Sequence, residues 1–247
     1  MSSSIETGHA KNVANFEKLI TNVTGFGRAY NPSKESIKLS ALNILLASAK
    51  NSINQVNSAE PAYKNAVSAR EAAFAPLAKL ITRVNNSLKA SNSSSQVDDS
   101  AMTLVRKLQG RRATPKLSDD EKKAAAAEGK EVNQVSASQM SYDSRLDNFD
   151  KLIKLLATEP EYSPNEADLK IESLTTYYND LSTKNTAVIN ATIPLNNARI
   201  SRNNVLYTPL TGVVDISADV KMYVKSVFGA TSPQYKAISG LTFTSAK

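Results

Sequence analysis

The sequence has no cysteine, no tryptophan and one histidine, His9, among its 247 residues. The absence of cysteine excludes disulfides, thiolate zinc sites and a cysteine nucleophile. A single histidine near the start of the chain excludes histidine-based catalytic triads, HExxH zinc sites and centres with several histidine ligands. We therefore predict that the protein is not an enzyme, and we expect no catalytic residue, no metal and no cofactor.

Turn-forming residues are also scarce, with only 8 glycines and 9 prolines. A sandwich or barrel of many short strands would need more tight turns than so few glycines can supply. The composition therefore favours a small number of long helices. We predict an all-α fold, an elongated helical bundle.

Long apolar runs and targeting signals are missing too. The first residues, MSSSIETGHAKN, lack the apolar core of a signal peptide. No apolar run approaches the roughly 20 residues that a membrane-spanning helix needs. We expect no membrane span and a cytoplasmic location. The net charge of +7 is a mild basic excess.

The most informative pattern that is present is an internal repeat. Residues 15–20 (NFEKLI) recur as residues 148–153 (NFDKLI), and residues 30–32 (YNP) recur as residues 162–164 (YSP). Further matches follow in the same order: Lys38 with Lys170, Leu42 with Leu174, Val56 with Val188, Asn65 with Asn197, and Arg70 with Arg202. The ordered series predicts a tandem duplication. The alternative is two similar amphipathic helices whose polar patterns converged.

The repeat divides the chain into five segments. We predict a flexible N-terminal tail over 1–11, a first helical repeat over 12–116 and a second over 145–236. Residues 117–144 are polar, rich in Ala, Lys and Glu, and nearly free of large apolar side chains, so we interpret them as a linker. Residues 237–247 are predicted to be a C-terminal tail.

Each repeat combines a short helix with a long helical stretch. Apolar residues alternate at spacings of four and three from Leu42 to Leu88 in the first repeat and from Leu174 to Val220 in the second. A sustained alternation of this kind is the heptad pattern of long packed helices, as in coiled coils. The pseudo-symmetric repeats would therefore each contribute one long helix to the bundle.

Prolines leave two interpretations of the long stretches open. Pro61 and Pro76 lie in the first, and Pro194 and Pro209 lie in the second. Each proline removes a backbone hydrogen bond and kinks or ends a helix. We favour a long kinked helix because the apolar phase is unbroken. The alternative is a helical hairpin that turns near 58–61 and 190–194, with proline in the first turn of its second helix.

Charged residues interrupt the middle of the apolar seam. The candidate polar layer is formed by Glu60, Arg70, Arg199 and Arg202. Buried charges are costly unless they are paired. These residues are either solvated, or paired across the repeats as Glu60 with Arg199 or Arg202, or a functional layer.

A basic segment, residues 104–116, is the candidate site for anion or nucleic-acid contacts. Its cations are Arg106, Lys107, Arg111, Arg112 and Lys116. Such a cluster can bind phosphates of nucleic acid or anionic lipid head groups. The second repeat does not preserve the arginine pair, and no aromatic residues are interleaved for base stacking. The alternative is a solvated helix end and loop.

Acidic residues supply the remaining enzyme hypothesis. The densest groups are Glu159 with Glu161, beside Pro160, and residues 119–121 (DDE) in the predicted linker. Neither group lies in an apolar pocket that would raise a carboxyl pKa for general acid catalysis. We interpret both as solvated surface.

These observations favour a binding function. We predict a non-enzymatic helical scaffold or protein–protein interaction protein that acts by binding a protein partner or by self-assembly. The alternative prediction is a nucleic-acid-associated protein that uses the basic segment 104–116.

Overall fold

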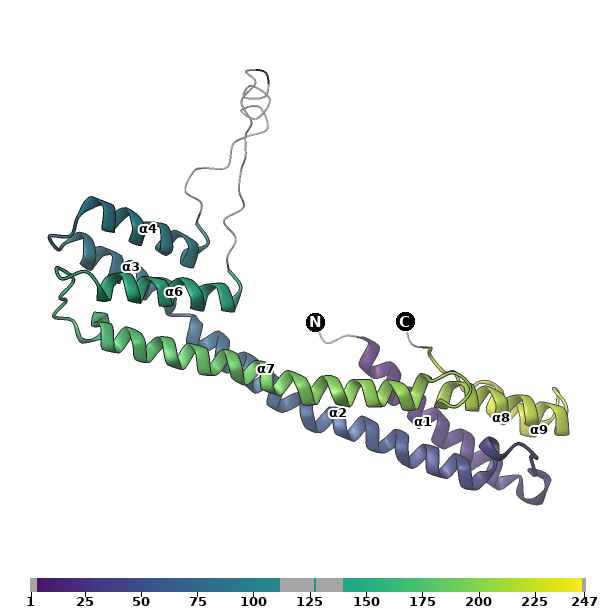
Figure 1. Ribbon diagram of the computed structural model, residues 1–247. Helices are drawn as coiled ribbons and strands as arrows, with labels where there is room; N and C mark the ends of the chain where they lie inside the picture. Colours follow the sequence, from purple (N-terminus) through teal and green to yellow (C-terminus); the bar gives the residue numbers. More distant parts are fainter. Residues whose placement is uncertain (1–3, 112–126, 128–139, 246–247) are drawn as a thin grey trace. The chain divides into compact units, whose positions relative to one another are not determined.

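A computed structural model describes residues 4–111, 127 and 140–245. Within these residues every regular element is a helix and there is no strand, which confirms the predicted all-α class (Figure 1). None of the helices in this part of the chain is both long enough and apolar enough to cross a membrane.

The chain forms two compact units. Unit 1 comprises Met1–Lys64 and Asn190–Lys247, and unit 2 comprises Asn65–Ile189. The elements of unit 1 are α1 (Ser4–Gly25), η1 (Gly27–Ala29), η2 (Glu35–Ile37), the first part of α2 (Leu39–Phe74), the last part of α7 (Ile171–Tyr207), α8 (Val213–Phe228) and α9 (Pro233–Ser239). Those of unit 2 are the rest of α2, α3 (Leu77–Lys89), α4 (Ser95–Gln109), α6 (Tyr142–Ala157), η3 (Ala167–Leu169) and the first part of α7. Each unit therefore takes residues from both predicted repeats, whose exact bounds stay a prediction.

The two longest helices, α2 and α7, continue through internal prolines. Pro61 lies inside α2 and Pro194 lies inside α7, so the long-helix interpretation holds and the hairpin turns do not form there. The predicted stretches are nevertheless interrupted further along, because α2 ends at Phe74 and α7 ends at Tyr207. Each end lies just before the next proline, where the residue preceding the ring disfavours helical geometry.

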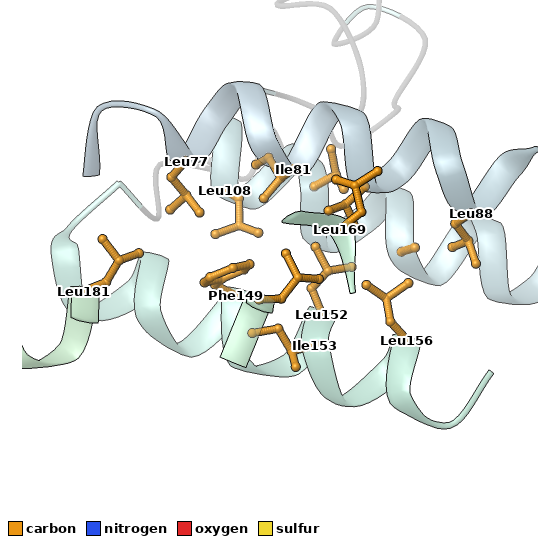
Figure 2. Packing of buried hydrophobic residues seen from close by; sticks show 14 of the residues in the cluster. Leu77, Ile81, Leu88, Leu108, Phe149, Leu152, Ile153, Leu156, Leu169 and Leu181 are labelled. Atoms are coloured by element: carbon orange, nitrogen blue, oxygen red, sulfur yellow. The ribbon is translucent and has the colours of Figure 1, made fainter. Parts of the chain in front are cut away.

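The core of unit 2 is built by α3, α4 and α6 with the start of α7. Figure 2 shows Leu77 and Ile81 of α3, Leu108 of α4, and Phe149 and Leu152 of α6 directed toward one another. All of them are at most 1% exposed. The apolar positions of α3 and α6 recur every three or four residues, which places them on one helix face.

The main core of unit 1 joins α1, α2, α7, α8 and α9. Its buried members include Phe16, Leu42, Leu206, Val220 and Ile238, one from each of these helices. A second, small cluster lies further along α2 and α7 and contains Val56, Leu195 and Ala198. The partly buried Ala59 and Tyr63 pack against this small cluster.

The two chain ends differ from the tails predicted over 1–11 and 237–247. Helix α1 begins at Ser4, and α9 extends to Ser239. The Asn12 side chain donates to the Thr244 carbonyl at 2.8 Å and accepts from the Thr244 backbone N–H at 2.9 Å, and Asn15 donates to the Thr242 carbonyl at 2.7 Å. Both asparagines are buried, so the C-terminal backbone satisfies polar groups that burial would otherwise leave unpaired. Most of the predicted linker 117–144 lies outside the described residues, and α6 begins within its predicted end.

A tyrosine fixes the loop before each long helix. The Tyr30 hydroxyl donates to the carbonyl of Ile37, the last residue of η2, at 2.6 Å. The Tyr162 hydroxyl donates to the carbonyl of Leu169, the last residue of η3, at 2.8 Å. Burial raises the pKa of Tyr30, and burial together with the nearby Asp168 carboxylate raises the pKa of Tyr162 to about 12.

Candidate interaction surfaces

The four residues of the predicted polar layer have separate environments. Glu60 forms an ion pair with Lys64, one turn further along α2, at 2.9 Å. Arg202 is buried, with 3% of its surface exposed, and donates to the Asn203 side chain at 3.0 Å. Arg199 is half-buried. Glu60 therefore has a local ion-pair partner on its own helix, and its pairing with Arg199 or Arg202 stays a prediction.

Arg70, the fourth member, belongs to unit 2 and joins a polar network there. Its guanidinium donates to the Asn185 side-chain oxygen at 3.0 Å and lies 3.8 Å from the centre of the Tyr142 ring. The Asn185 amide donates in turn to Asp143 at 2.7 Å. The network therefore surrounds the cation with an aromatic face, an amide and an indirectly linked carboxylate.

The end of α2 is capped by side chains that the sequence analysis did not identify. Arg145 donates to the Phe74 carbonyl at 3.1 Å, and the Tyr177 hydroxyl donates to the Ala73 carbonyl at 2.6 Å. Burial lowers the pKa of Arg145. The last carbonyls of a helix lack partners within the helix, so these contacts have a structural role. Arg145 is the first residue of the predicted second repeat. An arginine at this position does not by itself predict a contact with the Phe74 carbonyl.

The basic segment begins at the end of α4. Arg106 and Lys107 are half-buried in the last turn of that helix, where positive charge complements the helix dipole. Gly110 adopts a left-handed conformation with φ 67°, and the Arg111 N–H donates to the Arg106 carbonyl at 2.8 Å. This arrangement is a Schellman helix ending. The other two predicted contacts, Arg112 and Lys116, lie outside the described residues.

Of the two acidic groups, the structure describes Glu159 and Glu161. The Glu159 carboxylate accepts a hydrogen bond from the backbone N–H of Glu161 at 3.2 Å in an exposed turn. Residues 119–121 lie outside the described residues. Over the described ranges, no cluster of three or more histidine, cysteine or acidic side chains could hold a metal ion.

Unit 2 carries a pocket of about 370 Å³ between α3, η3 and α7. Pro76, Leu80 and Tyr177 line it together with the ion pair between Arg83 and Asp168. The hydrogen bond from Arg83 lowers the pKa of Asp168. Lys79 also lines the pocket, and no ion pair of Lys79 with another described residue is found. Because Arg83 and Asp168 neutralise each other, the pocket is a weakly charged surface hollow.

Unit 1 carries a larger groove, of about 680 Å³, between α2 and α7. The small or rigid side chains of Ala59, Ala198 and Pro194 line it. The remaining lining residues are polar but uncharged: Asn51, Asn54, Gln55 and Ser58 of α2, and Asn197 and Ser201 of α7. The groove lies at the level of the small Val56 cluster, where few side chains fill the space between the two helices.

Large apolar side chains are exposed next to this groove. Ile193 is 56% exposed and Ile200 is 59% exposed, and they lie four residues before and three residues after the groove-lining Asn197 on α7, which makes both of them its neighbours on the helix surface. Isolated exposed apolar residues are normal on soluble proteins, and apolar side chains beside a groove are a candidate interaction surface.

Comparisons of the chain with models of protein families, with curated proteins and with solved structures found no match. The functional proposal therefore depends on the surfaces described above.

Proposed function

We propose that the protein is a non-enzymatic helical scaffold that acts by binding a protein partner or another copy of itself. The observation that carries this proposal is the uncharged groove between α2 and α7, flanked by the exposed Ile193 and Ile200. Burial of exposed isoleucine against a partner is favourable by about 25 cal/mol for each Å² of apolar surface. The groove is held by two long helices, so its walls are set before a partner arrives.

Affinity capture with the full chain as bait tests the proposal. Extract from cells that express the protein is applied to the wild type, to an Ile193→Glu and Ile200→Glu double variant, and to Met222→Glu. Met222 of α8 is 62% exposed and provides a matched control outside the groove. We expect a protein retained by the wild type and the control but not by the double variant. Capture of no protein, combined with no self-association, would refute the proposal.

Nucleic-acid binding by the basic segment 104–116 is the second proposal. Arg111 is exposed just beyond α4, which supports it as a phosphate contact. Electrophoretic mobility shifts at low and at physiological salt test the proposal, because phosphate contacts weaken as salt rises. The variant Arg111→Ala with Arg112→Ala should weaken binding, and an unchanged shift would exclude this segment.

We also propose that the chain contains two copies of one helical unit. The order α1, η2, α2, α3 parallels the order α6, η3, α7, α8. The matching hydrogen bonds of Tyr30 and Tyr162 to the last residue of a 3-10 helix support this proposal. Each compact unit then combines the beginning of one copy with the end of the other.

A further inference from the structure

The outward face of α7 in unit 1 has a seven-residue periodicity. Asn190, Asn197 and Asn204 are exposed and seven residues apart, and Ile193 and Ile200 share that spacing. This series is distinct from the buried one that contains Leu195 and Leu206 of the same helix. A heptad series of isoleucine and asparagine is typical of helices that pack against other helices, and asparagine in such a series specifies register.

The same face lacks charge. Between residues 190 and 207 the charged residues are Arg199 and Arg202, which are half-buried and buried. Residues 51–59, which form the α2 wall of the groove, contain none. Solvated helix faces ordinarily carry charged side chains, so a neutral face on a chain with a net charge of +7 is unusual.

The lack of exposed charge on this face limits which class of molecule can bind there. A nucleic acid or an anionic membrane would be attracted by exposed cations, whereas the two cations of these stretches, Arg199 and Arg202, are half-buried and buried. The groove has no aromatic lining residue on which a base or a sugar could stack. The occupant that fits this groove is therefore an uncharged helical surface, and the same face of a second copy of this chain provides one.

The ridge and the groove are adjacent on one molecule and differ in shape. Ile193 and Ile200 project as large side chains, whereas Ala59 and Ala198 leave space between the helices. A twofold contact uses the same patch on both partners, so the patch must complement itself. An apolar ridge beside a groove lined by small residues and rimmed by carboxamides meets that requirement.

We propose that a second copy of this chain docks on this face, with the Ile193–Ile200 ridge of each copy in the α2–α7 groove of the other. The inference rests on the proposed binding function and names the partner. The 18 residues of α7 from 190 to 207 extend about 27 Å at 1.5 Å per residue. Two adjacent helices about 20 Å across give a footprint of about 500 Å², below the roughly 800 Å² that each partner buries in a typical stable complex. We therefore expect a reversible dimer with a micromolar dissociation constant.

Sedimentation equilibrium of the full chain over a concentration series tests the dimer. We expect wild type and Met222→Glu to associate equally, and Ile193→Glu with Ile200→Glu to associate at least tenfold more weakly. Both isoleucines are exposed, so circular dichroism should show unchanged helicity in the double variant. Equal association of the double variant and the wild type would overturn the inference, as would a wild type that stays monomeric.

Charge complementation tests the ridge-in-groove geometry directly. Asn51→Lys with Asn54→Lys places two cations on the α2 wall of the groove and leaves the ridge intact. Alone, this variant should associate more weakly than the wild type. Its mixture with the Ile193→Glu and Ile200→Glu variant should recover association, because one ridge then meets a groove of opposite charge while the other contact remains wild type. A mixture no stronger than either variant alone would overturn this geometry.

The outcomes separate this inference from the proposed function. A monomeric chain that still captures a different protein through the same isoleucines would overturn the inference and leave the proposed function standing. A dimer insensitive to both sets of substitutions would likewise refute only the named surface. Failure of both capture and association would remove both proposals.

Discussion

Unit 1 and unit 2 use the same kinds of apolar contact but different polar ones. In both units a buried phenylalanine lies near the middle of a helix and packs into the core: Phe16 of α1 in unit 1 and Phe149 of α6 in unit 2. The surface ion pairs have opposite polarity: Arg83 of α3 pairs with Asp168 of η3, whereas Lys34, just before η2, pairs with Asp219 of α8. In both units an ion pair thus links the 3-10 helix, or the residue just before it, to a neighbouring helix. The positions of the cation and the carboxylate are exchanged between the units.

The polar contacts of the corresponding helices α1 and α6 show a larger difference. In unit 1, the neutral side chains of Asn12 and Asn15 hold the backbone near Thr244. In unit 2, Arg145 instead caps the end of α2 at Phe74. The comparison indicates that polar positions can change their partners freely when the apolar face is kept, because hydrogen-bond partners are local while the core is shared.

Truncation of the central phenylalanines should have the largest effect. Phe16→Ala and Phe149→Ala each remove a fully buried ring, so each should lower the free energy of unfolding by about 3–5 kcal/mol. Hydrogen exchange followed by mass spectrometry should show the loss of protection concentrated in unit 1 for Phe16→Ala and in unit 2 for Phe149→Ala. Equal loss in both units would show that the two cores unfold together.

Two glycines should respond to alanine for different reasons. A Cβ at Gly212 in unit 1 would lie 2.8 Å from the Leu206 carbonyl oxygen and from the Thr208 nitrogen, so Gly212→Ala should destabilise by about 1–3 kcal/mol. Gly110 in unit 2 has φ 67°, and Gly110→Ala should cost about 1–2 kcal/mol through the left-handed backbone. Urea denaturation measures both. An unchanged midpoint for Gly212→Ala would mean that the turn after α7 adjusts easily.

The matched tyrosines should make similar contributions. Tyr30→Phe and Tyr162→Phe each leave a carbonyl without its hydroxyl donor, at a cost of about 1–3 kcal/mol in unfolding experiments. A markedly unequal pair of values would show that the two loops before α2 and α7 are not equivalent.

The raised tyrosine pKa values also predict a pH dependence. The pKa of Tyr162 is about 12 in the folded chain, above its ordinary value of 10.0, so the folded state favours the protonated hydroxyl. Its contribution to stability should be complete below pH 10 and should be lost as the pH rises toward 12. Tyr162→Phe should flatten the fall in stability over that interval. The same slope in the variant and in the wild type would contradict the assignment.

The ion pairs should have the smallest effect. Asp168→Asn and Asp219→Asn each remove one partner of an exposed or partly exposed pair, so each should lower the midpoint of thermal unfolding only slightly. High salt should reduce both effects, because it screens exposed charges. Thermal unfolding with and without 1 M salt measures this, and an effect that persists in salt would indicate hydrogen bonding rather than charge.

The fold was more predictable from the sequence than the candidate surface. Apolar spacing identified the seams of α2 and α7, because residues on one helix face recur every three or four positions whatever packs against them. The same spacing could not show that α2 ends at Phe74 while passing through Pro61. Whether a proline ends a helix depends on the contacts that compensate for the lost hydrogen bond, and those contacts are tertiary.

The surface residues show the opposite case. Ile193 and Ile200 lie outside the apolar seam of α7, but the sequence does not show whether another part of the fold covers them, and the structure leaves both exposed. Glu60 lies in the apolar seam, where the sequence left both solvation and a pairing with Arg199 or Arg202 open, and it forms an ion pair with Lys64. An i,i+4 pair forms on any helix surface without help from the rest of the fold.

By itself the sequence determined the helical class, the long helices and the absence of cysteine and multi-histidine chemistry, because these depend on composition and local periodicity. The tertiary structure decided that unit 1 draws on both ends of the chain, that Asn12 and Asn15 hold residues 242–244, and that a groove opens between α2 and α7. These features depend on which helix faces meet across large sequence separations, and local periodicity carries no information about that choice.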